Sequence, residues 1–120
     1  MSTDLVLITA LIKPQFEGRV IHALHDLPTF PGFTLTEARG QGRGRGVGGS
    51  YVASEHDLVY QRHLQLQVVC AAFDAEFITR IIREMAWTGQ RGDGVIYTVP
   101  VCSFARIRET GRSAEQEGVR

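Results

Sequence analysis

The sequence predicts an α+β fold of order β-α-β-β-α-β, with two helices on one face of a four-stranded antiparallel sheet. Two observations lead to this prediction. Short apolar or alternating runs, typical of strands, flank two longer stretches with helical periodicity. The chain has 120 residues and 43% hydrophobic content, which suits one compact domain with a real core. This is the ferredoxin-like arrangement, and it leaves one sheet face that trimerisation would bury.

The first half of the chain contains two strands and a helix. Residues 5–12 are almost continuously apolar and end at Lys13-Pro14, as expected for a central strand. Phe33 and Leu35 alternate with threonines, so residues 33–39 are predicted to form the second strand. Between these strands, apolar residues recur with the period of a helix. The apolar face of this helix consists of Phe16, Val20, Ile21, Leu24 and Leu27.

The second half repeats the pattern. Alternation of Leu64, Leu66 and Val68 predicts a third strand, and residues 95–101 are expected to form the last one. Asp74 is the expected N-cap of a second helix that Gly89 ends. The domain is predicted to span residues 1–112, followed by a flexible polar tail at 113–120. The apolar stripe of the second helix is Phe77, Ile78, Ile81, Ile82, Met85 and Ala86.

Composition excludes several classes of protein. A net charge of zero and a pI near 6.9 give no general attraction to nucleic acid or to an anionic membrane. The longest apolar stretch, residues 5–12, is too short to cross a bilayer, and no signal peptide is recognisable. Cys70 and Cys102 are expected to be buried free thiols. These features predict a soluble cytoplasmic protein without direct membrane insertion.

Residues 40–49 form a Gly/Arg-rich segment that begins a long stretch without periodicity. Successive glycines can expose backbone N–H groups to an anion, and Arg43 and Arg45 can clamp phosphates. The match of residues 44–49 to G-x-G-x-x-G does not open a helix, and no G-K-[ST] follows, so Rossmann and Walker A loops are rejected. A flexible solvated linker is an equally good interpretation of this segment alone.

Two further segments are compatible with phosphate. Residues 88–94 join a helix end to a strand, and glycines flank Asp93 there, although an ordinary tight turn explains this segment as well. Arg106 and Arg108 would lie on one side of an extended segment, where a solvated charged edge is the alternative.

The histidines point less clearly to a function. His22 and His25 are spaced to share a helical face and could hold a metal, but exposed helix histidines are commoner. His56 and His63 belong to the long loop and its exit. No nucleophile with a positioned base is visible, so an enzyme is not expected.

Several short motifs follow one another in a specific order along the chain, roughly from Leu5 to Gly111. They are Ile12-Lys13-Pro14, Thr36-Glu37-Ala38-Arg39-Gly40, Gly42-Arg43, Ile81-Ile82-Arg83, Thr88-Gly89, Gly92-Asp93-Gly94 and Arg106-Ile107-Arg108. In this order and spacing the chain resembles the PII signal-transduction proteins. It looks most like a divergent branch whose members often lie beside heavy-metal efflux genes.

The resemblance implies a homotrimer that binds ATP, ADP or AMP in clefts between neighbouring subunits, with magnesium as a further candidate ligand. A T-loop at about 42–60, between the second and third strands, would change shape and dock on a target protein such as a transporter or an enzyme. Leu11 and Leu64 would flank the base, and Arg106 and Arg108 would reach the phosphates from the adjacent subunit. The implied nucleotide-binding residues are Leu11, Gly40, Gln41, Gly42, Arg43, Gly44, His63, Leu64, Thr88, Gly92, Asp93, Gly94, Val95, Arg106 and Arg108. The implied partner-binding residues of the T-loop are Arg45, Tyr51, Glu55, His56 and Tyr60.

The chain departs from the family pattern at four positions. Gly44 stands where the family has the glutamine that helps to hold magnesium and 2-oxoglutarate, and His63 replaces a lysine that also holds 2-oxoglutarate. Val95 replaces a phosphate-binding lysine, and His56 aligns with the tyrosine that some members have uridylylated. The response to 2-oxoglutarate and the uridylylation are therefore expected to be lost.

Two functions remain in competition. The first is a nucleotide-responsive regulator, and the second is a metal-binding ferredoxin-like accessory protein of a heavy-metal efflux system. The second would use His22, His25, His56 or His63. The Gly/Arg-rich segments favour the regulator, because a metal-binding protein has no need of them.

Overall fold

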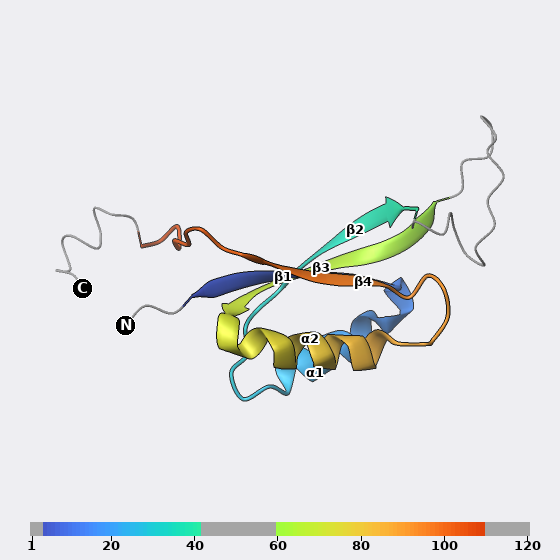
Figure 1. Ribbon diagram of the computed structural model, residues 1–120, viewed down its shortest axis with the longest axis horizontal. Helices are drawn as coiled ribbons and strands as arrows, with labels where there is room; N and C mark the ends of the chain where they lie inside the picture. The colour runs from blue at the N-terminus through green and yellow to red at the C-terminus, as the bar shows by residue number, and fades with distance from the viewer. Residues whose placement is uncertain (1–3, 42–59, 110–120) are drawn as a thin grey trace.

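The computed structural model describes residues 4–41 and 60–109, and it has the predicted order of elements (Figure 1). Most of the predicted T-loop, residues 42–59, and the whole tail at 113–120 lie outside the described residues. Neither helix in the described part has the length and apolar character needed to cross a membrane. The strands are β1 (Leu5–Ile12), β2 (Thr34–Gly40), β3 (Gln61–Ala71) and β4 (Gly94–Pro100). The helical segments are the 3-10 turn η1 (Pro14–Phe16), α1 (Glu17–His25) and α2 (Ala72–Ala86).

The strands form one antiparallel sheet of order β2-β3-β1-β4. β1 lies inside the sheet, as its continuous apolar sequence predicts, and β2 and β4 form the edges. Both helices cover the same face of the sheet (Figure 1), so the predicted ferredoxin-like arrangement is confirmed.

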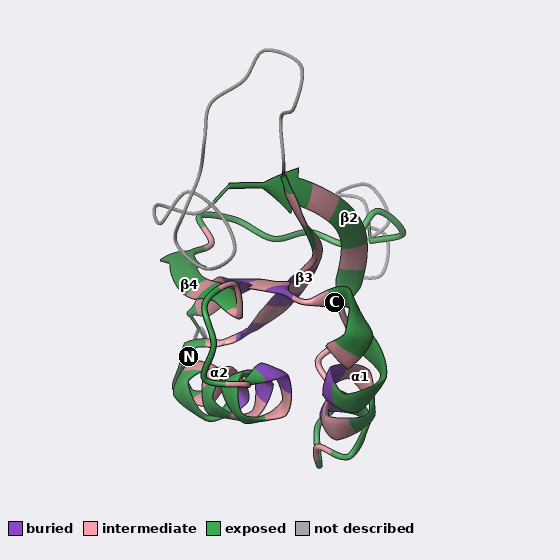
Figure 2. Cartoon of the chain, turned by 90° about the vertical axis from the view of Figure 1, so that its right-hand side faces the viewer, coloured by how far each residue is buried: buried purple, intermediate pink, exposed green. Residues whose placement is uncertain are grey.

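The core lies between the helices and this covered face. In β1, Ile8, Ala10 and Ile12 are buried and lie opposite residues of β3 that also face the helices. Because side chains alternate between the faces of a strand, every second residue of β1 and β3 contributes to the core. Figure 2 shows the buried parts of α1 and α2 turned toward the sheet and toward each other. The helical side chains of this core are Val20, Leu24, Ile78 and Ile82.

The other face of the sheet carries no helix, yet much of it is apolar. Leu7, Thr9 and Leu11 of β1 lie opposite Val99, Tyr97 and Val95 of β4, respectively. Tyr97 is 50% exposed and Val95 is 57% exposed. This open face, defined by the β1 and β4 residues just named, matches the predicted surface that needs a partner.

The predicted N-cap of the second helix is wrong. α2 begins at Ala72, and Asp74 lies in its first turn. The chain passes directly from β3 into the helix, and the Ala72 N–H donates a hydrogen bond of 2.8 Å to the Asp4 carbonyl. A neighbouring strand therefore satisfies a backbone donor that a capping side chain would otherwise satisfy.

Two further predictions need correction. Cys70 is buried, and this burial, followed by the charge of Asp74, raises the pKa of its thiol. Cys102 is exposed instead, because it follows β4 on a segment that extends beyond the core. Phe77 is predicted to belong to the buried stripe of the second helix, but it is 46% exposed because it lies on the side of α2 that faces away from the sheet.

Candidate functional site

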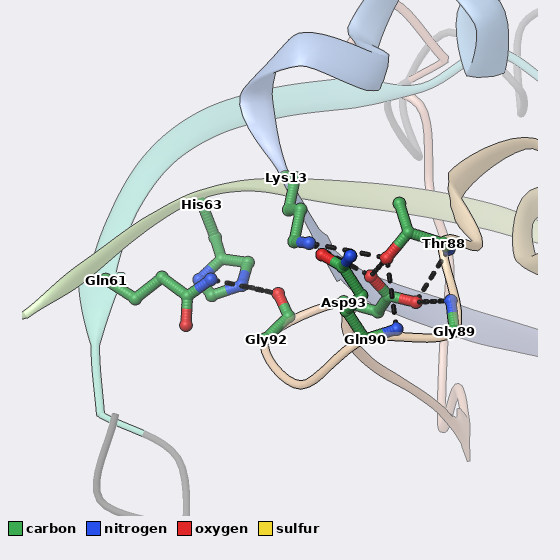
Figure 3. A network of polar contacts seen from close by, with 8 residues as sticks. All are labelled: Lys13, Gln61, His63, Thr88, Gly89, Gln90, Gly92 and Asp93. Atoms are coloured by element: carbon green, nitrogen blue, oxygen red, sulfur yellow. Dashed lines mark hydrogen bonds and ion pairs between the residues drawn. The ribbon is translucent and has the colours of Figure 1, made fainter. Parts of the chain in front are cut away.

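The loop between α2 and β4, residues 87–93, is organised around the carboxylate of Asp93 (Figure 3). The backbone N–H groups of Thr88 and Gly89 donate to Asp93 Oδ2 at 2.8 and 2.9 Å. The Thr88 hydroxyl donates to Oδ1, and Lys13 Nζ lies 3.1 Å from the same oxygen. The lysine and aspartate side chains are only 13% and 21% exposed, so this network ties the loop to the end of β1.

The network also determines the charge of Asp93. Burial opposes ionisation of the carboxyl group, but hydrogen bonds from the Thr88 hydroxyl and backbone, from Lys13 and from Gly89 outweigh it. Together they hold the pKa of Asp93 well below its usual range. Asp93 is therefore ionised in the folded protein at neutral pH, and its hydrogen bonds hold the loop in its conformation.

A second set of contacts joins this loop to β3. Gln61 Nε2 donates to the Gly92 carbonyl at 3.0 Å, and His63 Nε2 lies 3.2 Å from the same oxygen (Figure 3). The tautomer of His63 with its proton on Nε2 donates the second hydrogen bond. Gly92 has a φ of +88°, and a Cβ there would lie 2.5 Å from the Gln61 amide nitrogen. The loop thus contacts the strand that leaves the predicted T-loop.

A cavity of about 360 Å³ lies beside this loop, between α2 and the strands β1 and β4. It contains four of the predicted nucleotide-binding residues, namely Leu11, Asp93, Gly94 and Val95. It is also lined by residues that the sequence did not suggest as ligand contacts. These are Ile12, Thr79, Arg83, Ala86, Trp87 and Ile96.

A larger cavity of about 600 Å³ lies between η1 and the strands β2 and β3. Of the predicted nucleotide-binding residues it contains only His63 and Leu64. Arg39 and Arg62 face each other across the two strands at this point, and Glu17 and Glu37 also line the cavity. The charges around this cavity are therefore balanced.

The predicted nucleotide-binding residues fall into separate groups. Thr88 and residues 92–95 lie together on the α2–β4 loop and at the start of β4. Gly40 ends β2 and Gln41 follows it, whereas Gly42, Arg43 and Gly44 lie outside the described residues. In the predicted T-loop, Tyr60 is 48% exposed immediately before β3. Arg45, Tyr51, Glu55 and His56 lie outside the described residues.

Leu11 and Leu64, the two residues expected to flank the base, do not meet within one chain. Leu11 lies opposite Gln65 and Val95 on the open face, whereas Leu64 lies opposite Ile12 and packs against the core. Neighbouring positions on paired strands point to opposite faces of a sheet, so these two side chains are separated by the sheet itself.

The segment with Arg106 and Arg108 is predicted to be extended, and this prediction is wrong, because the segment forms a turn. The Glu109 N–H donates to the Arg106 carbonyl at 3.0 Å, and Arg106 Nε lies 3.9 Å from Glu109 Oε1. This local pairing replaces the extended backbone that would have aligned both guanidinium groups. The turn lies at the opposite end of the sheet from the α2–β4 loop (Figure 1), so one chain does not bring these groups together.

The described histidines do not converge on one point. His22 Nε2 lies 3.5 Å from Asp26, and the His25 ring stacks on Phe30 with centroids 4.2 Å apart. His63 contacts the α2–β4 loop instead. Within residues 4–41 and 60–109, no three His, Cys, Asp or Glu side chains are grouped so that they could hold a metal.

Lys13, Gln61 and Trp87 contribute to this region, although the sequence did not mark them as site residues. Lys13 belongs to the Ile-Lys-Pro motif, which was the available signal for it. Gln61 lies outside the alternating pattern used to find β3, and Trp87 follows the helical stripe. Nothing in their sequence context indicated that they meet near the α2–β4 loop.

Comparisons with known proteins agree with this geometry. The sequence model of the family "Nitrogen regulatory protein P-II" matches residues 5–111. A nitrogen regulatory protein P-II of Rhizobium meliloti is 38% identical over 109 residues, covering 89% of this chain and 96% of the relative. Nitrogen regulatory protein GlnK of Escherichia coli K12 is 31% identical, covering 91% of this chain and 96% of the relative.

A solved structure also has this fold. The crystal structure of Arabidopsis thaliana PII bound to citrate matches with a TM-score of 0.69 and 23% identity, covering 89% of this chain and 86% of that one. This similarity concerns the fold, whereas the family assignment rests on the sequence. The motifs around Lys13, Thr88 and Asp93 lie within the matched residues 5–111. The chain therefore belongs to the nitrogen regulatory protein P-II family of signal-transduction proteins.

Proposed function

We propose that this chain binds adenine nucleotides, ATP, ADP or AMP, in clefts between the subunits of a homotrimer and regulates a partner protein through its T-loop. The observation that carries the proposal is the ordered α2–β4 loop. Asp93, Thr88 and Lys13 fix its backbone, and the loop borders a cavity that contains Leu11 and Val95. A loop with several glycines and a fixed backbone offers N–H groups to a phosphate at little entropic cost.

The separation of the arginine turn from this loop supports a site built from two subunits. Arg106 and Arg108 lie at the far end of the same sheet, so they can approach an α2–β4 loop only in another chain. The exposed open face, with Tyr97 and Val99, offers the surface that would join the subunits.

The proposed regulator acts without 2-oxoglutarate. Val95 supplies no charge, and His63 contacts the Gly92 carbonyl, so the two family lysines have no counterpart at these positions. Gly44 and His56, on which the loss of the metabolite response and of uridylylation also depends, lie outside the described residues. Magnesium would be bound through the nucleotide phosphates. The proposed setting is the cytoplasm, and the proposed partner is a transporter or an enzyme.

Titration calorimetry with ATP, ADP and AMP tests nucleotide binding directly. We expect at least one nucleotide to bind at or below millimolar concentration, with no turnover of ATP beyond a trace. Asp93→Asn is expected to weaken binding about tenfold or more, because the loop loses its anchor. Asp26→Asn, which changes an exposed aspartate on the far side of the fold, is the matched control. Absence of binding by all three nucleotides would refute the proposal.

Mixed assemblies test whether the site lies between subunits. Asp93→Asn damages the loop side of the cleft, and the double change of Arg106 and Arg108 to Gln damages the other side. If both sides belong to different chains, mixing the two variants regenerates some intact sites and recovers part of the binding. Failure to recover any binding, with mixed assemblies verified by mass, would refute a site built from two subunits.

A further inference from the structure

The side of α2 that faces away from the sheet exposes large aromatic side chains. Phe73 is 80% exposed, Phe77 46% and Trp87 69%, although the opposite side of the helix is buried in the core (Figure 2). Aromatic residues grouped on one exposed surface mark sites of protein association. This surface lies on the helical layer, away from the open face of the sheet, so it is distinct from the surface proposed for trimerisation.

The exposed residues follow a regular spacing. Phe73, Phe77, Arg80, Glu84 and Trp87 are separated by four, three, four and three positions. This is the spacing of the contact residues of a coiled coil, which are separated alternately by three and by four positions. The guanidinium of Arg80 lies over the Phe77 ring, 5.4 Å from its centroid, so the charged and aromatic members of the seam are in contact. The outer side of α2 thus resembles a helix–helix interface.

A hollow in the surface lies at one end of this seam. A surface cavity of about 360 Å³ is lined by Arg80, Arg83, Glu84 and Trp87. Arg80, Arg83 and Glu84 lie on α2 and Trp87 immediately follows it, so the hollow lies at the C-terminal end of the helix. The Trp87 ring lies so close to Gly89 that a Cβ there would stand 2.8 Å from its Cζ2, so only glycine at that position leaves room for the ring.

We propose that this seam binds the α2 helix of a second copy of the chain in antiparallel orientation, across a twofold axis. Charge complementarity favours this orientation. In an antiparallel pair, Arg80 lies opposite Glu84 of the partner subunit and Glu84 opposite Arg80 of the partner subunit. In the same register, Phe77 lies near the end of the partner subunit's helix, where Trp87 of the partner subunit borders the hollow. A parallel pair would place each charge opposite its own copy, which is unfavourable.

The arrangement satisfies the rule for a twofold interface. In such an interface one surface meets itself, so each contact between two different residues occurs twice. A seam with one cation, one anion and an aromatic residue on either side is self-complementary only when it is reversed. The result is association of chains beyond the proposed trimer, through the helical layer.

Charge reversal tests this proposal with the full-length chain. The measurement is the mass of the assembly by analytical ultracentrifugation at rising protein concentration. We expect wild-type protein to form a species of higher mass than its smallest assembly. Arg80→Glu and Glu84→Arg should each raise the dissociation constant of this step about tenfold or more, since each creates two like-charge contacts. The double variant should restore association, because the opposite charges meet again.

Controls separate the interface from effects on folding. Arg19→Glu reverses an arginine on α1 that also lies over a phenylalanine ring, 5.7 Å from the centroid of Phe16, and it should leave association unchanged. Trp87→Ala should weaken association without changing the circular dichroism spectrum, because the side chain is largely exposed. A wild-type mass that does not rise with concentration overturns the proposal. Association that survives both single reversals, or that the double variant fails to restore, overturns it too.

Discussion

Gly94 begins β4 where the backbone of β1 lies closest to it. Its φ is +112°, and a Cβ there would lie 1.7 Å from the Leu11 carbonyl oxygen. No side chain fits this position without separating β4 from the central strand. We expect Gly94→Ala to reduce the free energy of unfolding by about 3 kcal/mol or more, or to prevent folding. Urea denaturation followed by circular dichroism measures this loss.

Gly18 provides the matched control for that substitution. It lies in α1, and a Cβ there would have no neighbour within 4 Å. Gly18→Ala is expected to stabilise the protein by about 0.5–1 kcal/mol, because alanine favours the helix. A Gly94→Ala protein as stable as the wild type would show that β1 and β4 do not approach so closely.

Asp93 makes the stability of the fold depend on pH. Its folded-state pKa is lowered, so as the pH falls the unfolded chain binds this proton first. The stabilisation is complete above the unfolded pKa of about 4 and is lost as the pH falls through that value toward the folded pKa. The free energy of unfolding should therefore decrease on acidification more steeply for wild type than for Asp93→Asn.

Unfolding by urea at several pH values between neutral and about pH 3 gives this comparison. Thr88→Val keeps the size of the side chain but removes the hydroxyl that donates to the carboxylate. Its pH dependence should fall between those of wild type and Asp93→Asn. Identical pH dependence in all three proteins would exclude the hydrogen-bonded carboxylate as the cause.

At the scale of elements, β3 and the α2–β4 loop are joined through a single acceptor, the Gly92 carbonyl. Gln61 and His63 both donate to it, so removing one donor leaves the other in place. Gln61→Leu and His63→Leu should each cost about 0.5 kcal/mol, whereas the double variant should cost about 1–3 kcal/mol because the acceptor is left without a partner. A double-mutant cycle from denaturation midpoints measures the excess, and strictly additive losses would refute this coupling.

The elements themselves were largely predictable from local patterns. The helical spacing of the apolar residues in α1 and the alternation in β3 identify side chains that do lie in or against the core. The prediction of a helix and a strand at these places is therefore confirmed. The start of α2 was not predictable, because its first donor is satisfied by Asp4, which is distant in the sequence. The turn at Arg106 was not predicted either. Three residues that alternate between charged and apolar do not distinguish a strand from a turn.

The candidate site was only partly predictable. The glycines flanking Asp93 indicated unusual backbone angles, and Gly92 and Gly94 do have positive φ. The side-chain partners of Asp93 and Gly92 come from β1 and β3, and no local pattern identifies such pairings. Leu64 shows the remaining difficulty. It pairs with Ile12, the residue after Leu11, so its side chain lies on the opposite face of the sheet from that of Leu11. No local sequence pattern specifies this register.

At the scale of the whole molecule, the open face is the surface proposed for trimerisation. Tyr97 lies near its centre, opposite Thr9, and is 50% exposed in one chain. If the proposed trimer forms through this face, Tyr97→Lys buries three charges near the threefold axis and should reduce the assembly to monomers at micromolar concentration. Light scattering coupled to size-exclusion chromatography measures the mass.

Thr98→Lys is the matched control for this substitution. Thr98 is the next residue on the same edge strand, exposed on the other face of the sheet, opposite Ile8. The same charge there should leave the mass unchanged. A Tyr97→Lys protein that keeps the wild-type mass would show that the subunits meet elsewhere.

The first strand begins at a point where several backbone segments meet, since the carbonyls of Asp4 and Leu5 accept hydrogen bonds from Ala72 and Val101. The first and last described residues therefore lie at one end of the sheet, and the ends of β2 and β3 that border residues 42–59 lie at the other (Figure 1). This polarity is useful for partner capture. Attachment to a sensor surface through either terminus would leave the end proposed to contact the partner directed toward solution.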